Sequence, residues 1–307
     1  MTGAITPEQA VDFLTGRFGR HPGQRTLHAK GTLCRGSFTA TPEAGRLTRA
    51  AHMQGRPVEA LVRFSNGAGD PDLPDHAPDV RGLAVKFLLP DGSRTDISAQ
   101  TVPRFPVSTP EAFIELLRVN SVRGIPRLWR LLLFMTHQPG ATRAAKLNAE
   151  ALRPPSSYAG ITYYAVHAFK WIDAHRGQRY VRYRFEPEEE EPRLAVVEAH
   201  KRGANYLQEE LRKRLRKGPI KFTLVLQLAG ESDEVDDPSA AWPEDRETVT
   251  AGTLRVISLE TEYENDHVLV FDPTRLTDGI EASDDPVLLF RPRAYSVSVK
   301  RRTAGDA

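Results

Sequence analysis

A tyrosine near the end of the sequence, Tyr295, follows an arginine, Arg291, by four positions. A phenol binds ferric iron well only as the phenolate. Because a free phenol has a pKa of about 10, it needs a fixed positive charge beside it to ionise at neutral pH. Arg291 could supply that charge. The alternative is a strand tyrosine with a surface arginine nearby, and this segment alone does not decide between the two.

A second group of residues suited to chemistry lies near the other end of the sequence. Residues 25–31 contain His28, and an imidazole can accept and return a proton at neutral pH because its ordinary pKa is about 6.5. Segments 62–65 and 79–87 follow, and they carry arginines and a serine on expected strands. A lone histidine is more simply interpreted as a packing residue. The catalytic interpretation of His28 therefore depends on the motif around it.

Strands must position these residues. Apolar alternation predicts strands at about residues 26–38, 58–65, 81–89, 162–172, 179–186, 219–229 and 252–261. Helices are expected at 110–119, 126–137, 141–152 and 204–217, the last ended by Gly218. Residues 6–9, Thr-Pro-Glu-Gln, have the pattern of a capped helix start. We therefore expect an α+β fold, an antiparallel β-barrel with inserted and peripheral helices.

The composition favours a globular protein that acts on a small molecule. The sequence has 307 residues and a net charge of +2, without the basic excess of a nucleic-acid binder. No linker divides it, so we expect a single domain over residues 1–307.

The cysteine count and the apolar segments favour the cytoplasm. The single cysteine, Cys34, excludes an internal disulfide and a cysteine-based zinc site, and it suits a reducing compartment. Acidic Glu8 and Asp12 interrupt the segment where a secretory signal would be apolar. The most apolar helix, at 128–135, is too short for a bilayer, which needs about 20 apolar residues. We expect a cytoplasmic protein with no membrane partner.

Two patterns that suggest other functions have simpler interpretations. Glycines 67 and 69 follow a strand, as in a dinucleotide-binding loop, but the Asp-Pro-Asp-Leu-Pro run after them prevents the helix that such a loop requires. Residues 211–217 are basic, yet leucines at 207, 211 and 215 recur at helical spacing, which is typical of an amphipathic helix. We expect neither a nicotinamide site nor a nucleic-acid site.

The segments around His28 resemble the core of the haem-dependent catalases. That family carries a distal histidine in a His-Ala-Lys-Gly run, then a Val-Arg-Phe-Ser strand and an Arg-Gly-Phe-Ala-Val-Lys-Phe strand. The corresponding segments are residues 28–31, 62–65 and 81–87, with further matches at 163–171, 237–243 and 271–281. Tyr295 falls at the place of the proximal ligand. The resemblance covers nearly the whole chain. Its length matches the short catalase-related peroxidases, which keep the barrel and lack the C-terminal domain of full catalases.

The resemblance implies haem b as the cofactor and a role for each matching residue. Tyr295 would be the iron ligand, kept ionised by Arg291. His28 would move a proton between the two oxygens of a peroxide. Ser65 would hydrogen-bond the other ring nitrogen of His28 and so fix its tautomer, although an ordinary strand serine is the alternative.

Buried haem propionates need cationic partners, and the resemblance assigns this role to Arg25, Arg63 and Arg302. For Arg302 the alternative is a charged tail at residues 300–302.

Three departures from full catalases bear on function. Thr101 stands where catalases have a distal asparagine that helps to place a second hydrogen peroxide molecule, and the shorter threonine should do this poorly. We therefore include Thr101 among the candidate catalytic residues. The Pro-Asp-Thr-His run after the ligand is replaced by Ser-Val-Ser-Val at 296–299, and the long arm that interlocks catalase tetramers is missing. The resemblance therefore does not imply a catalase-like tetramer, and a homodimer is the alternative.

The expected activity is reduction of organic hydroperoxides, and of hydrogen peroxide weakly, by an external electron donor, as part of an oxidative stress response. The alternatives are a true catalase that dismutates hydrogen peroxide, an isomerase of fatty-acid hydroperoxides, and a protein that only binds or senses haem. The last would leave a proton shuttle at His28 without a use. The sequence does not identify the physiological peroxide or the donor.

Overall fold

Alternating side chains give the strands one face for a barrel interior. In β7 (Ile220–Leu228) every even-numbered residue is apolar and buried. The computed structural model describes residues 4–121, 125–137, 148–261 and 268–304. In it β7 pairs antiparallel with β6 (Gln178–Pro187) and β8 (Thr248–Leu259). The alternation predicted from the sequence is therefore confirmed in this part of the sheet.

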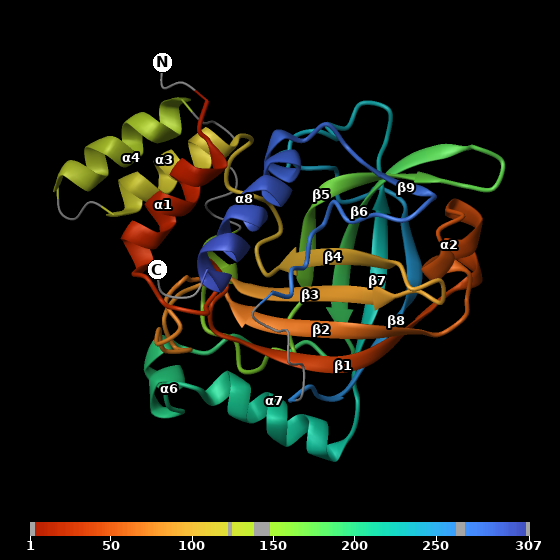
Figure 1. Ribbon diagram of the computed structural model, residues 1–307, viewed down its shortest axis with the longest axis horizontal. Coiled ribbons are helices and arrows are strands. Elements are labelled where there is room, and N and C mark those ends of the chain that lie inside the picture. Colours follow the sequence, from red (N-terminus) through yellow and green to blue (C-terminus); the bar gives the residue numbers. More distant parts are fainter. Residues whose placement is uncertain (1–3, 122–124, 138–147, 262–267, 305–307) are drawn as a thin grey trace.

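Eight antiparallel strands close into a barrel in the described part of the chain. Their order is β4-β3-β2-β1-β8-β7-β6-β5, and the pair Gln100–Tyr164 joins β4 to β5 (Figure 1). The remaining strands are β1 (Gly31–Ala40), β2 (Val58–Asn66), β3 (Arg81–Leu88), β4 (Arg94–Gln100), β5 (Tyr163–Ile172) and the short β9 (Ile280–Ala282), which pairs with the end of β5. Closure pairs both edge strands, so the barrel has no long free edge. The predicted antiparallel barrel is confirmed.

Aromatic side chains occupy the core. The ring of Phe64 in β2 lies 5.6 Å from that of Tyr158, 6.3 Å from that of Tyr163 and 6.1 Å from that of Phe222, centroid to centroid. These four rings come from three strands and one loop, and all are fully buried. Large rings at offset geometry fill the interior and hold the strands in register.

Helices cover the barrel on separate sides (Figure 1). Helices α1 (Pro7–Phe18), α3 (Pro110–Ser121) and α4 (Ile125–His137) form a group, and α8 (Pro286–Thr303) lies between this group and the barrel. The others are α2 (Pro42–Leu47), α6 (Val196–Lys201) and α7 (Tyr206–Lys217), with a short 3-10 turn at Ala51–Met53. None of the described helices is long and apolar enough to cross a membrane.

Most predicted helices are confirmed. Thr6 caps α1 with the expected capping box, and Gly218 follows the end of α7, whose leucines at 207 and 211 are buried. The helix expected at 141–152 falls largely outside the described residues, although residues 148–151 are helical. No expectation covered β4, β9 or α8.

The strand predicted to begin at residue 26 is wrong at its start. Strand β1 begins at Gly31, and residues 26–30 form a loop in which His28 has a φ of +55°. A left-handed residue breaks a strand. The loop is stable because the His28 N–H donates to Gly67 O at 3.0 Å instead of to a strand partner. His28 therefore lies in the loop just before β1 and not in the sheet.

We predict that buried His52 makes the fold sensitive to acid. Its ring lies 4.8 Å from that of Phe87, and burial lowers its pKa to about 3. His52 is therefore neutral in the fold, whereas in the unfolded chain it binds a proton below about pH 6.5. Between these values stability falls as pH falls, and at pH 5 this loss is about 2 kcal/mol.

Urea unfolding at pH 7 and pH 5 measures this contribution. His52→Leu should lose about 2 kcal/mol less than the parent protein between the two pH values. The exposed histidine at 175 provides the control, and His175→Leu should leave the pH dependence unchanged. An unchanged pH dependence in His52→Leu would show that His52 is not held neutral.

Candidate active site

Helix α8 carries Arg291 and Tyr295 on one face. The helix starts at Asp285, whose Oδ1 accepts hydrogen bonds from Val287 N and Leu288 N, and Pro286 occupies its first turn. Residues four apart lie one above the other on a helix, so the spacing seen in the sequence becomes a contact. Arg291 Nε donates to Tyr295 Oη at 2.8 Å. The structure therefore brings a fixed positive charge to the phenol oxygen.

A buried histidine and aspartate hold the Arg291 guanidinium. Arg291 Nη1 lies 3.0 Å from His167 Nε2, and His167 Nδ1 lies 2.6 Å from Asp285 Oδ2. Because arginine can only donate, His167 Nε2 must accept, and the ring proton must sit on Nδ1 and point to Asp285. Burial also lowers the pKa of His167, which keeps the ring neutral as this arrangement requires. Asp285 thus uses one oxygen to cap α8 and the other to orient His167.

His167 and Asp285 were not among the predicted site residues. The match of segment 163–171 to the catalase core assigns no role to the histidine within it. The available signal was a histidine at a position of β5 where the strand is otherwise apolar. For Asp285 the sequence signal was an Asp-Pro pair, the pattern of a helix start, which was not used.

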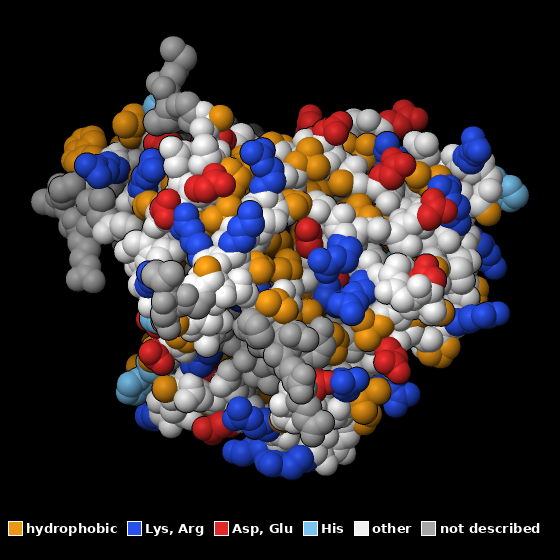
Figure 2. Space-filling view, viewed as in Figure 1, with side chains coloured by type: hydrophobic (Ala, Val, Ile, Leu, Met, Phe, Trp, Pro, Cys, Tyr) orange, Lys and Arg blue, Asp and Glu red, His pale blue; other side chains and the backbone are white. Residues whose placement is uncertain are grey.

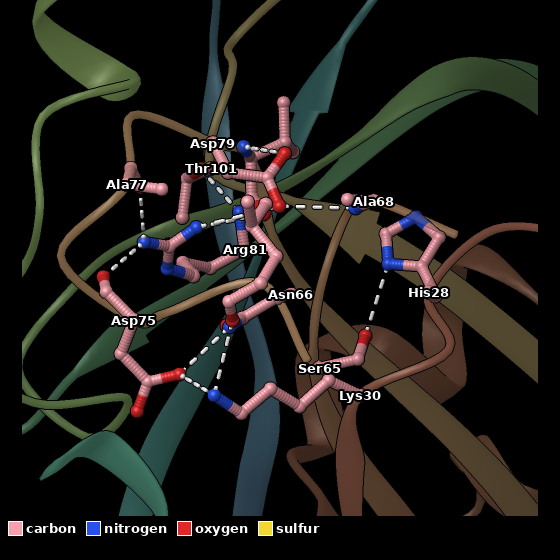
Figure 3. Close-up of polar contacts among 12 residues, drawn as sticks. His28, Lys30, Ser65, Asn66, Ala68, Asp75, Ala77, Asp79, Arg81 and Thr101 are labelled. Carbon is pink, nitrogen blue, oxygen red and sulfur yellow. Dashed lines mark hydrogen bonds and ion pairs between the residues drawn. The ribbon is translucent and has the colours of Figure 1, made fainter. Parts of the chain in front are cut away.

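His28 is held at two points and is partly buried. Ser65 Oγ lies 3.0 Å from His28 Nδ1, and the His28 backbone N–H is bonded to Gly67 O (Figure 3). The contact with Ser65 is made through Nδ1, the ring nitrogen other than Nε2. Burial lowers the His28 pKa to about 3, and the charges of Arg63, Arg291 and Arg25 lower it further. The ring is therefore neutral at pH 7, with Nε2 available to accept a proton.

A buried polar network fixes the loop behind His28 (Figure 3). Asp75 accepts from Asn66 Nδ2 at 2.8 Å and pairs with Lys30 Nζ at 2.9 Å. Arg81 Nη2 donates to Asp75 O at 2.7 Å, and the Arg81 side chain is fully buried. Satisfied networks of this kind are rigid, because breaking one member leaves another buried and unpaired. The loop carries Gly67, so the network positions the carbonyl that holds the His28 backbone.

The three predicted propionate arginines lie near the same end of β1. Arg25 Nη2 and Arg302 Nη2 both donate to Leu269 O, at 3.0 and 3.1 Å, so these two guanidinium groups are neighbours. Arg63 Nη2 donates to Ala29 O at 3.2 Å, next to His28. Arg302 therefore lies beside Arg25 and does not extend away as part of a charged tail.

The Thr101 hydroxyl forms its hydrogen bonds with backbone groups and not with the His28 ring. Its Oγ1 accepts from Arg81 N at 3.1 Å and donates to Ala151 O at 3.4 Å. The side chain is buried, so this hydroxyl links the first residue of β3 to the helical residues 148–151. Ser65 is bonded to His28, whereas both hydrogen bonds of Thr101 go to backbone groups.

The two sides of the site meet at α8. Thr26 Oγ1, two residues before His28, lies 2.9 Å from Ser298 Oγ, three residues after Tyr295. The loop of His28 and the helix of Tyr295 are therefore in direct contact, although they come from opposite ends of the sequence. The structure therefore brings the two segments that carry His28 and Tyr295 together.

Comparison with known sequences assigns the chain to a family. The sequence model of the family Catalase matches residues 16–306. A catalase-related peroxidase of Mycolicibacterium paratuberculosis is 48% identical over 307 residues, covering 100% of this chain and 97% of the relative. A catalase-related peroxidase of Synechococcus elongatus is 35% identical, covering 98% of this chain and 90% of the relative. The chain belongs to the catalase family, as its motifs indicated.

Solved catalases share the fold at low sequence identity. A bacterial catalase has a TM-score of 0.81 at 23% identity, covering 92% of this chain and 58% of its own. Catalase A from Saccharomyces cerevisiae has a TM-score of 0.80 at 23% identity, covering 92% of this chain and 62% of its own. At this identity the likeness concerns the fold, and it agrees with the closed antiparallel barrel.

Members of the catalase family bind haem, and the residues at this site fit that group. Tyr295 Oη is a phenol oxygen with a guanidinium beside it, a donor that would suit ferric iron. The charges of Arg25, Arg63 and Arg291 all reach His28, and this concentration of positive charge matches a group with two carboxylates. The site therefore fits haem in two respects, an oxygen donor suited to the iron and cationic partners suited to the two carboxylates.

Gly82 is predicted to be required for the His28–Ser65 bond. A Cβ on Gly82 would lie 2.7 Å from Ser65 Oγ and 2.9 Å from His28 Nδ1, so both groups would have to move. Gly82→Ala should lower peroxide turnover about 100-fold, the scale of a misplaced acid-base group, while the protein stays folded.

The matched control is Gly16→Ala, because a Cβ there would meet no atom within 4 Å. Steady-state kinetics and circular dichroism of both variants give the comparison. Parent-like turnover in Gly82→Ala would contradict the requirement for the Ser65 contact.

Proposed function

We propose that this protein is a haem-dependent peroxidase that reduces organic hydroperoxides with electrons from an external donor, and that its cofactor is haem b. The observation that carries the proposal is the pairing of two features. Neutral His28 is bonded to Ser65 through Nδ1, and Arg291 donates to Tyr295 Oη on the helix that contacts the His28 loop. The two relatives of nearly equal length are named catalase-related peroxidases, which supports the same activity.

His28 performs the proton transfer in the proposed reaction. Its Nε2 accepts the proton from the inner oxygen of the hydroperoxide and returns it to the outer oxygen as the O–O bond breaks. Ser65 holds Nδ1, so the ring presents Nε2 throughout. The overall change is ROOH + 2 H⁺ + 2 e⁻ to ROH and water, with the electrons supplied by the donor. When bound, the haem iron supplies the centre that accepts and passes on these electrons.

Tyr295 Oη would hold the iron, and the Arg291 guanidinium keeps positive charge beside that oxygen. His167 and Asp285 keep Arg291 in place, since each accepts a hydrogen bond that fixes its neighbour. Arg25, Arg63 and Arg302 would hold the two carboxylates. These residues bind and orient the cofactor, and they leave the acid-base step to His28.

One observation favours organic hydroperoxides over dismutation of hydrogen peroxide. The Thr101 hydroxyl is bonded to Arg81 N and Ala151 O, so it has little capacity to place a second peroxide molecule.

The proposal predicts donor-dependent turnover. Purified haem-loaded protein should reduce tert-butyl hydroperoxide to its alcohol while it oxidises a dye donor, and it should release little oxygen from hydrogen peroxide alone. His28→Ala should retain haem and lose about 100-fold or more in turnover. His175→Ala, at an exposed turn, is the control and should match the parent protein.

Other results would replace the proposal with an alternative. Rapid oxygen release from hydrogen peroxide without a donor would identify a true catalase. A rearranged lipid product from a fatty-acid hydroperoxide, with no donor consumed, would identify an isomerase. Bound haem without turnover of any peroxide would identify a binding or sensing protein.

A further inference from the structure

Helix α4 exposes large apolar side chains along one stripe. Trp129 is 69% exposed, Leu132 57% and Leu133 61%. Positions three and four apart lie on the same face of a helix, so these three side chains form one continuous surface. Apolar patches of this kind on a protein surface mark contact sites more often than isolated apolar residues do. The stripe therefore requires a partner.

The opposite face of the same helix already has one. Phe134 is buried and Leu131 is partly buried in the second apolar cluster, with Val107, Ala112 and Val119. The helix is held on the protein by this inner face. The outer stripe is not a displaced core surface, because core packing is satisfied on the other side.

The segment that carries the stripe has basic but no acidic residues in its sequence. Between Glu115 and Glu150 the sequence contains no Asp or Glu, although it contains several Arg and Lys. Arg130 on α4 is exposed, one turn before Leu133. An apolar stripe beside an exposed arginine complements a surface that is apolar within and anionic at its boundary.

The position of α4 suits a broad, flat partner. Figure 1 places α4 at the outer edge of the molecule, farther from the barrel than α3 or α8. Figure 2 shows hydrophobic side chains at that edge with Lys or Arg side chains next to them. A protruding helix can lie on a plane, whereas a protein groove would have to enclose it. A helix with Trp and Leu on one face and Arg beside them is typical of an interfacial membrane anchor.

We propose that α4 docks this protein on an anionic lipid surface. Trp129, Leu132 and Leu133 enter the boundary between headgroups and acyl chains, and Arg130 lies at the level of the lipid phosphates. The helix lies in the plane of the membrane and does not span it. The sequence-based expectation of no membrane partner rested on the shortness of this segment, which excludes a span but not an interfacial helix.

The proposal goes beyond the peroxidase activity and does not depend on it. It nevertheless connects the two surfaces, because the inner face of α4 belongs to the cluster that contains Phe105, and Phe105 packs against His167. Docking would hold the site close to lipid-derived hydroperoxides. Binding is measured directly, so a failure of lipid docking and a failure of catalysis can be told apart.

Co-sedimentation of the haem-loaded protein with vesicles tests the docking surface. The protein should sediment with vesicles of phosphatidylglycerol and phosphatidylcholine, more weakly with phosphatidylcholine alone, and less at high salt. The double variant Leu132→Gln/Leu133→Gln should bind at least about tenfold more weakly, because two apolar side chains no longer leave water. Arg130→Glu should weaken binding to the anionic vesicles by about fivefold or more.

Val197→Gln is the matched control, since Val197 is 70% exposed on α6, and it should bind vesicles like the parent protein. The absence of parent binding to anionic vesicles would overturn the proposal. Equal loss of binding in Val197→Gln would also overturn it, because the effect would not be specific to α4. A stable dimer in size-exclusion chromatography that Leu132→Gln/Leu133→Gln dissociates, without vesicle binding, would instead assign the stripe to a second copy of the chain.

Discussion

One guanidinium group joins the two halves of this structure. Arg291 donates to Tyr295 Oη within α8 and to His167 Nε2 in β5, so a helix near the end of the chain is fixed in rotation against the barrel wall. The contact works only because His167 is neutral and because Asp285 holds its proton on Nδ1. Loss of any member would leave a buried polar group unpaired and would free the phenol from its positive neighbour.

The His28 side of the site is built on a different principle. His28 stands in a left-handed conformation in a loop, which no regular strand could provide. It is held by one side chain and one backbone carbonyl, and the carbonyl is positioned by the Lys30, Asn66, Asp75 and Arg81 network. Many of the buried charged residues in this region therefore hold the His28 loop in place. The result is a neutral imidazole close to three arginines, a state that an exposed histidine would not keep.

The sequence predicted the parts of this arrangement that depend on local periodicity and on motif order. Alternation located β7, and the capping pattern located α1. The match of residues 28–31 and 62–65 to the catalase core paired His28 with Ser65, which lie at hydrogen-bond distance. The sequence shows the Arg291–Tyr295 spacing but does not predict the helix that explains it, because Pro292 and the alternating residues after Tyr295 are atypical of a helix.

Contacts across the fold could not be read from the sequence. The role of His167 depends on which residue of α8 faces β5, and that is decided only when the barrel closes. The shared acceptor of Arg25 and Arg302, Leu269 O, likewise joins segments that no local pattern connects. Thr101 was placed by its match to a family asparagine, whereas its bonds to backbone groups depend on how β3 meets an adjoining helix. The exposed stripe of α4 looked apolar in the sequence, but only the packing of its inner face shows that the stripe faces outward.

The most direct test of the account is the absorption spectrum of haem-loaded Tyr295→Phe beside that of the parent protein. The variant lacks the oxygen that Arg291 contacts, so the account predicts a changed haem spectrum, consistent with loss of the phenolate ligand. Tyr180→Phe, at a half-buried position on β6, is the control and should leave the spectrum unchanged. An unchanged spectrum in Tyr295→Phe, with haem bound in the same proportion, would contradict the claim that Tyr295 holds the iron.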